Sequence, residues 1–153
     1  MTSLVDTYLE CDHATANSKN LLISIRPKYV DAILDGSKSV ELRRTRPNVA
    51  LGSVVLLYSS SPVKAIVGWA CLADVFEGTP GEVWDAHQEA TAVSGDAFDE
   101  YFDGSPIAFG LRLHRVVRAS NPVLLKELRE LGVEPPQSWR YLDGDLADLI
   151  RSK

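Results

Sequence analysis

Cysteine and histidine are scarce in this chain of 153 residues. The two cysteines, Cys11 and Cys71, lie in a polar and an apolar stretch, and the three histidines are far apart in the sequence. Neither pattern matches a disulfide framework or the ligand spacing of a zinc site. We therefore expect Cys11 and Cys71 to remain unbridged, and we expect no metal ion and no other cofactor.

Long apolar runs are also missing. No stretch reaches the roughly 18 consecutive apolar residues of a membrane helix, and the early residues Asp6, Glu10 and Asp12 do not fit a secretory signal. These absences predict a reduced, cytoplasmic protein without membrane contact. Residues 1–20 are polar with weak periodicity, so we expect a loosely ordered leader followed by a single domain over residues 21–153.

An excess of positive charge is absent as well. The chain has 16 Lys+Arg against 21 Asp+Glu, a net charge of −5, which argues against strong, sequence-independent binding to duplex nucleic acid. The charges are segregated, however: residues 19–46 hold seven bases and three acids, whereas residues 74–103 hold nine acids and no Lys or Arg. The basic region can bind an anion and the acidic region a protein partner. Segregation of solvated charges by chance explains the pattern equally well.

Hydrophobic periodicity and capping residues predict the elements. Strands are expected at residues 21–25, 39–44, 53–59, 65–76 and 107–117. Helices are expected after Pro27, after the capping box Thr79–Glu82, after Ser94, after Pro122 and after Tyr141, with a turn at 135–139.

The order of these elements predicts an α+β fold. Most long strands follow one another without a crossover helix, which favours a small, mainly antiparallel β-barrel or strongly curved sheet surrounded by helices over a doubly wound parallel sheet. Gly68 and Gly110 inside predicted strands indicate bulges or a bend.

The stretch from Gly36 to Arg44 carries the most chemistry. In a regular strand Glu41 and Arg43 share one face, while Lys38 belongs to the preceding turn. A lysine, a carboxylate and an arginine this close offer a group for proton transfer, a hydrogen-bond acceptor and an anion clamp. A ladder of surface ion pairs has the same spacing, and spacing alone favours that interpretation.

The same residues resemble a known family. Gly36-x-Lys38-x-x-Glu41-x-Arg43 is similar to the signature of the ASCH domain family of the PUA-like superfamily, and the resemblance extends over about residues 21–142. It implies a small PUA-like barrel ringed by helices. It also implies that the motif lines a cleft for RNA, single-stranded nucleic acid or a modified nucleotide.

Some small ASCH proteins are amidohydrolases of 4-acetylcytidine, and others are ribonucleases. Lys38 matches the lysine that the amidohydrolases use in catalysis, whereas Glu41 stands where they have a threonine. Their downstream catalytic glutamate falls in the region of Glu82 and Glu89. If the chain is an enzyme, we expect Lys38 to act as the base and Glu41 to orient it or a water molecule.

Further residues are candidates for contact with a nucleic acid. Arg26 and Arg44 can meet phosphates, Ser60 can bind an anion or a base edge, and Tyr58 and Trp139 can stack on an unpaired base. An ordinary turn at Ser60 and ion pairs for the arginines are the plain alternatives. The leading hypothesis is a module that binds one of these ligands through Arg26, Lys38, Glu41, Arg43, Arg44, Tyr58, Ser60 and Trp139. The second hypothesis is a hydrolase acting on the same ligand, and the third is a regulatory domain that binds a protein through residues 74–103.

Overall fold

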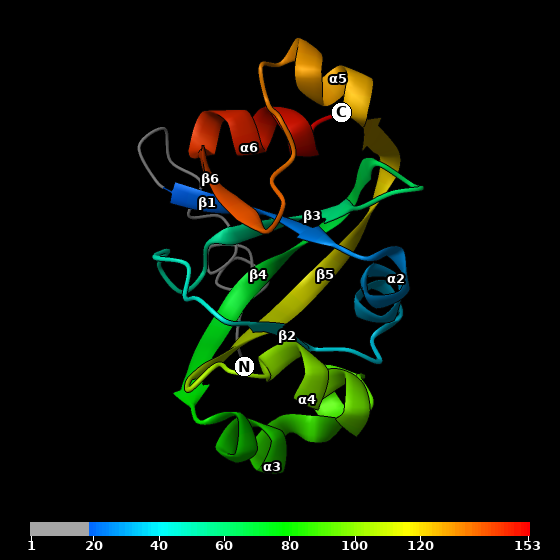
Figure 1. Cartoon of the computed structure of the whole chain (residues 1–153). Coiled ribbons are helices and arrows are strands. Elements are labelled where there is room, and N and C mark those ends of the chain that lie inside the picture. Colours follow the sequence, from blue (N-terminus) through cyan, green and yellow to red (C-terminus); the bar gives the residue numbers. More distant parts are fainter. Residues whose placement is uncertain (1–18) are drawn as a thin grey trace, which may run out of the picture.

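The computed structural model describes residues 19–153, which form one six-stranded sheet with helices on both faces and at one end (Figure 1). The strands are β1 (Lys19–Ile25), β2 (Val40–Arg43), β3 (Val54–Ser59), β4 (Ala65–Gly78), β5 (Ala108–Leu124) and β6 (Trp139–Asp143). The helices are α2 (Pro27–Asp35), α3 (Pro80–Thr91), α4 (Gly95–Phe102), α5 (Leu125–Glu130) and α6 (Gly144–Arg151).

The sheet is mainly antiparallel, as expected. Its order is β2-β5-β4-β3-β1-β6, and the pair β1–β3 is parallel, while the other pairs are antiparallel. The α+β class is therefore confirmed and a doubly wound sheet is excluded. Between residues 19 and 153, β2 and β6 remain the edges of the sheet, so closure into a barrel is not confirmed.

Local signals in the sequence account for several helices. Pro27 is the first residue of α2, and Gly36 ends that helix with a φ of 91°, which suits glycine. In α3 the side chain of Thr79 accepts from the backbone of Glu82 and the Glu82 side chain accepts from the backbone of Thr79, forming the predicted capping box. The hydroxyl of Ser94 caps α4, also as predicted.

Two predictions near the C-terminal end were wrong. Pro122 does not begin a helix: β5 continues to Leu124, and α5 starts at Leu125. Residues 119–122 of β5 have no partner in the register with β4, so the missing N–H of Pro122 interrupts no ladder bond. The segment 135–139 is not only a turn, because β6 begins at Trp139 and pairs with β1. The two prolines before Trp139 favour a turn, and the strand that follows has five residues.

Three hydrophobic clusters join the helices to the sheet. Alternate residues of β1 point to opposite faces, so Leu21 and Ile23 pack under α2, whereas Leu22 packs under α5 and α6. The third cluster joins Val40 and Leu42 of β2 to α3 and α4. Figure 1 shows α3 and α4 together at the end of the sheet opposite α5 and α6.

Some predictions concern residues that the structure does not describe. The loosely ordered leader lies almost wholly outside residues 19–153, and β1 begins at Lys19 rather than Leu21. Cys71 takes part in a disulfide bond, contrary to the expectation that it is unbridged, and Cys11 lies outside the described residues. None of the helices between residues 19 and 153 is long and apolar enough to cross a membrane.

Gly68 lies in β4 directly against the backbone of Val117 in β5. The register shifts on both sides of β4 at this point, which confirms the predicted irregularity. A Cβ at Gly68 would collide with the backbone carbonyl oxygen of Val117 and would come within 2.9 Å of Leu34 Cδ2. The position therefore requires glycine for lack of space.

We expect Gly68→Ala to lower the free energy of unfolding by about 1–3 kcal/mol, because the backbone of β5 must move to admit the methyl group. Gly81→Ala is the matched control, since no atom lies within 4 Å of its Cβ position in α3. Urea unfolding of both variants measures the difference. Equal midpoints for Gly68→Ala and the parent protein would contradict this account.

Candidate functional site

A pocket of about 610 Å³ opens where the parallel strands β1 and β3 end. Because the carboxyl ends of parallel strands meet at one edge of a sheet, the residues that follow them come together there. Arg26 follows β1 and Ser60 follows β3, and the Ser60 N–H donates to the Ile25 carbonyl over 2.9 Å. The pocket is lined by Ser24, Ile25, Arg26, Tyr29, Lys38, Glu41, Leu42, Arg43, Arg44, Ser60, Val93, Ala97, Phe98, Glu100, Tyr101 and Gln137.

The turn that carries Lys38 is held by backbone hydrogen bonds from three elements. The Lys38 N–H donates to Ala32 of α2 over 3.0 Å, and the Ser39 N–H donates to Ala90 of α3 over 2.9 Å. The Ser39 carbonyl in turn accepts from Leu113 of β5 over 2.8 Å. These contacts place the Lys38 side chain before β2 begins, as its charge suggested.

Lys38 is almost completely buried, with 2% of its surface exposed. Its Nζ donates to the Thr91 carbonyl at the C-terminal end of α3 over 2.6 Å and lies 3.4 Å from Glu41 Oε1. The end of a helix carries partial negative charge, so both neighbours attract the ammonium group. Burial nevertheless lowers the pKa of Lys38 below its usual range, although Glu41 opposes this shift.

Glu41 connects the two cations of the motif. One of its carboxylate oxygens faces Lys38, and the other accepts from Arg43 over 2.5 Å. Both oxygens are thus occupied in a side chain that is 9% exposed. Glu41 and Arg43 share a face, as the alternation of the strand predicted, while Val40 and Leu42 pack into the third cluster. The ion pairs exist, but they are buried rather than a surface ladder.

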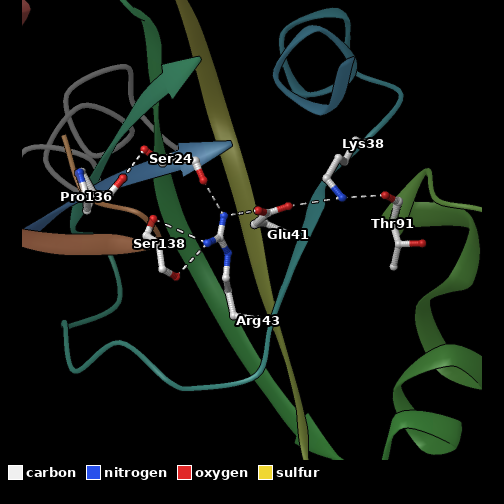
Figure 2. Close-up of polar contacts among 7 residues, drawn as sticks. All are labelled: Ser24, Lys38, Glu41, Arg43, Thr91, Pro136 and Ser138. Carbon is white, nitrogen blue, oxygen red and sulfur yellow. Dashed lines mark hydrogen bonds and ion pairs between the residues drawn. The ribbon is translucent and has the colours of Figure 1, made fainter. Parts of the chain in front are cut away.

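Arg43, on the edge strand β2, extends this row of polar contacts to β1 and the start of β6 at the opposite edge of the sheet. Its guanidinium donates to the Ser24 carbonyl and to the Ser138 hydroxyl, each over 3.0 Å. Figure 2 shows the row running from Ser24 and Ser138 through Arg43, Glu41 and Lys38 to Thr91. Arg43 Nε is buried and has no hydrogen-bond partner among residues 19–153.

The lining is more positive than the chain as a whole. Four basic residues, Arg26, Lys38, Arg43 and Arg44, face two acidic ones, Glu41 and Glu100, a formal excess of two positive charges. Arg26 also precedes α2, where Pro27 has no N–H and the Tyr29 N–H donates to the Arg26 carbonyl over 2.9 Å. Among residues 19–153 this leaves the Lys28 N–H as the donor of the first turn that can face an anion.

The aromatic residues of the pocket differ from the predicted ones. Tyr58 is 5% exposed within the second hydrophobic cluster, and Trp139 packs beside Tyr141; neither lines the pocket. Tyr29, Phe98 and Tyr101 line it instead. The Lys38 Nζ lies 5.3 Å from the Tyr29 ring centroid.

The opposite wall of the pocket comes from α4, within the acidic segment 74–103. The Arg44 guanidinium lies 5.1 Å from the ring centroid of Tyr101 and so connects this helix to the chain after β2. Glu82 and Glu89 do not line the pocket, whereas Glu100 does. Sequence reasoning missed Glu100 and Tyr101 because the fold, and not local spacing, brings α4 to the motif.

A family model supports the resemblance seen in the motif. The model of the ASCH domain matches residues 23–121, which run from the end of β1 through most of β5. The chain belongs to the ASCH domain family. The match covers the strands and helices that build the pocket, except for the segment with Gln137 and Ser138.

Relatives with known names agree with this assignment. A protein named ASCH domain-containing ribonuclease, from Zymomonas mobilis, is 35% identical over 126 residues, covering 81% of this ASCH chain and 84% of the relative. The crystal structure of ASCH from Zymomonas mobilis has a TM-score of 0.82 at 29% identity and covers 88% of this chain and 94% of that one. Human THYN1 protein, in complex with DNA containing 5-methylcytosine, has a TM-score of 0.54 at 12% identity over 88% of this chain and 96% of that one, so it shares the fold alone.

We expect Glu41→Gln to lower the free energy of unfolding by about 3–5 kcal/mol, because it leaves two buried cations without their carboxylate. Glu134→Gln is the matched control: its partner Arg129 lies at 2.9 Å, but both side chains are more than half exposed. An exposed pair contributes at most about 1 kcal/mol. Urea unfolding distinguishes them, and an equal loss in the two variants would contradict a buried network.

Proposed function

We propose that this ASCH domain binds single-stranded RNA, holding one nucleotide of it in the pocket between the sheet and α4. The observation that carries the proposal is the combination of a positive wall with an exposed aromatic ring in one concave site. Such a site suits a ligand with an anionic end and a flat end. The relative from Zymomonas mobilis that is named a ribonuclease supports RNA as the ligand class.

In this proposal the phosphate of the nucleotide lies against the positive wall, at the ends of β1 and β3. Arg26 and the hydroxyl of Ser60 lie there, next to the start of α2, and Arg44 joins them from the chain after β2. Arg43 Nε, a buried donor without a partner between residues 19 and 153, also favours an anionic ligand. The net charge of −5 elsewhere disfavours wrapping of a long duplex, so a short single strand fits better.

Lys38, Glu41 and Arg43 form the floor beneath this ligand. Lys38 and Arg43 hold the carboxylate of Glu41 from both sides, so the row keeps one net positive charge under the phosphate. Because the row is buried, this charge is screened less than a surface charge. In this proposal the motif supports the shape and the potential of the pocket.

We expect Arg44→Gln to weaken binding of a short labelled single-stranded RNA about fivefold and to reduce the salt dependence by about one counterion, since one phosphate contact is lost. Lys126→Gln is the control, because Lys126 is exposed on α5 and does not line the pocket. Fluorescence anisotropy at two salt concentrations measures both quantities. Equal affinities of the two variants would count against the pocket as the RNA site.

A second candidate function is hydrolysis of the bound ligand, which the ribonuclease relative favours. Lys38 would take the proton from the 2′-OH, the freed oxygen would attack the neighbouring phosphorus, and the bond to the 5′-oxygen of the next nucleotide would break. Arg43 would stabilise the charge on the phosphorane. Burial lowers the pKa of Lys38, which makes the neutral, basic form more available near neutral pH. Release of acetate from 4-acetylcytidine by the same base is the alternative reaction.

If Lys38 is the base, we expect Lys38→Met to reduce strand cleavage by at least about a hundredfold, far more than it weakens RNA binding through the lost charge. The substitution removes one buried charge and leaves Glu41 paired with Arg43, so the fold should survive, which circular dichroism can check. The rate of the parent protein should rise with pH and level off below 10.5, the ordinary pKa of lysine, because only the neutral amine accepts a proton.

Mass analysis of the products, with and without a chelator, distinguishes strand cleavage from acetate release. Cleavage by Lys38→Met at the parent rate would rule out Lys38 as the base. Retention of RNA without any product would leave a binding module. The cytoplasmic location and a protein partner for the acidic segment 74–103 stay predictions.

A further inference from the structure

We propose that Glu100 and Tyr101 of α4 form a base-selecting wall that prefers guanine. This inference rests on the proposed function, since it names which nucleotide the same pocket accepts. It assigns the flat end of the ligand to α4, opposite the phosphate wall formed by Arg26, Arg44 and Ser60.

The orientation of α4 is determined by its buried side. Phe98 and Phe102 pack into the third hydrophobic cluster with Val40 and Leu42 of β2. The rings of Phe98 and Phe102 lie 4.7 Å apart, and the Phe102 ring also meets Tyr101 edge to face at 4.8 Å. The helix therefore presents Glu100 and Tyr101 to the pocket from a supported position.

The two carboxylates of the pocket differ in burial and in the partners that hold them. Glu41 has both oxygens engaged, by Lys38 and by Arg43, and is buried. Glu100 is exposed, and between residues 19 and 153 no hydrogen bond or ion pair holds its carboxylate. In this proposal the acceptor that a base meets is therefore Glu100, whose oxygens are available, rather than Glu41.

An ionised carboxylate offers two acceptors and no donor. Guanine has two adjacent donors on its Watson–Crick edge, N1–H and the 2-amino group, and can bind both oxygens at once. Adenine and cytosine place a ring-nitrogen acceptor beside their amino group, and uracil flanks its N3–H with two carbonyls. These acceptors repel the carboxylate, so guanine is the base that fits it.

Tyr101 supplies the surface on which the base stacks. Its side chain is 37% exposed, and the Arg44 guanidinium lies 5.1 Å from its ring centroid. A base entering along this ring stays next to Arg44, which joins the stacking wall to the phosphate wall. Stacking holds any base, so discrimination depends on Glu100.

Titration calorimetry at pH 7 with GMP, IMP, AMP, CMP and UMP tests the proposal. We expect GMP to bind about tenfold more tightly than AMP, CMP and UMP, with IMP between them because it lacks the 2-amino group. Glu100→Gln should weaken GMP binding about tenfold and should not weaken UMP binding, because uracil loses a repulsive neighbour. Asp99→Asn is the matched control, because it removes the same charge from an exposed neighbour that does not line the pocket.

The outcomes are distinguishable. Equal affinity for all five monophosphates, or GMP binding that Glu100→Gln and Asp99→Asn weaken equally, would overturn guanine selection while nucleotide binding by the pocket stands. A preference for another base would overturn it as well. Failure of every monophosphate and of single-stranded RNA to bind would overturn both the selection and the proposed function. GMP preference lost in Glu100→Gln alone would support the assignment.

Discussion

The buried carboxylate of Glu41 is the contact on which the site depends. Two cations, Lys38 and Arg43, are taken out of water on either side of it, and neither could remain there charged without a partner. Through them β2 is connected to the end of α3 at Thr91 and to β1 at Ser24. The row of charges in Figure 2 therefore connects the floor of the pocket to β1 and to the end of α3.

The sequence predicted most of the frame of this site, because local rules govern it. The period of a strand put Glu41 and Arg43 on one face, and the signals at Pro27, Gly36 and Thr79 gave the bounds of the helices nearby. Burial was not predictable from the motif: the depth of Lys38 depends on α3, which is more than 40 residues later in the chain. For the same reason Tyr58 was interpreted as a stacking residue, although its ring lies in the core.

The family match and the pocket answer different questions: the first concerns the fold, and the second concerns the ligand. The family match gives the frame, and the ribonuclease relative gives a ligand class for a neighbour. What this chain adds is its own distribution of charge: arginines after β1 and β2 and a carboxylate on the facing helix. A ligand with an anionic phosphate at one end and hydrogen-bond donors at the other matches that distribution.

The helices α3 and α4 connect β4 to β5, and these two strands pair directly with each other. Gly78, the last residue of β4, lies opposite Ala108, the first residue of β5, so the pairing of these strands extends to the point where the connection begins and ends. Because of this arrangement, a segment of another sequence could replace residues 79–107, join the same two residues and form the facing wall of the pocket. That segment would have to offer an apolar face for Val40 and Leu42 and two carbonyl oxygens, one for the Lys38 ammonium and one for the Ser39 N–H, which Thr91 and Ala90 now supply.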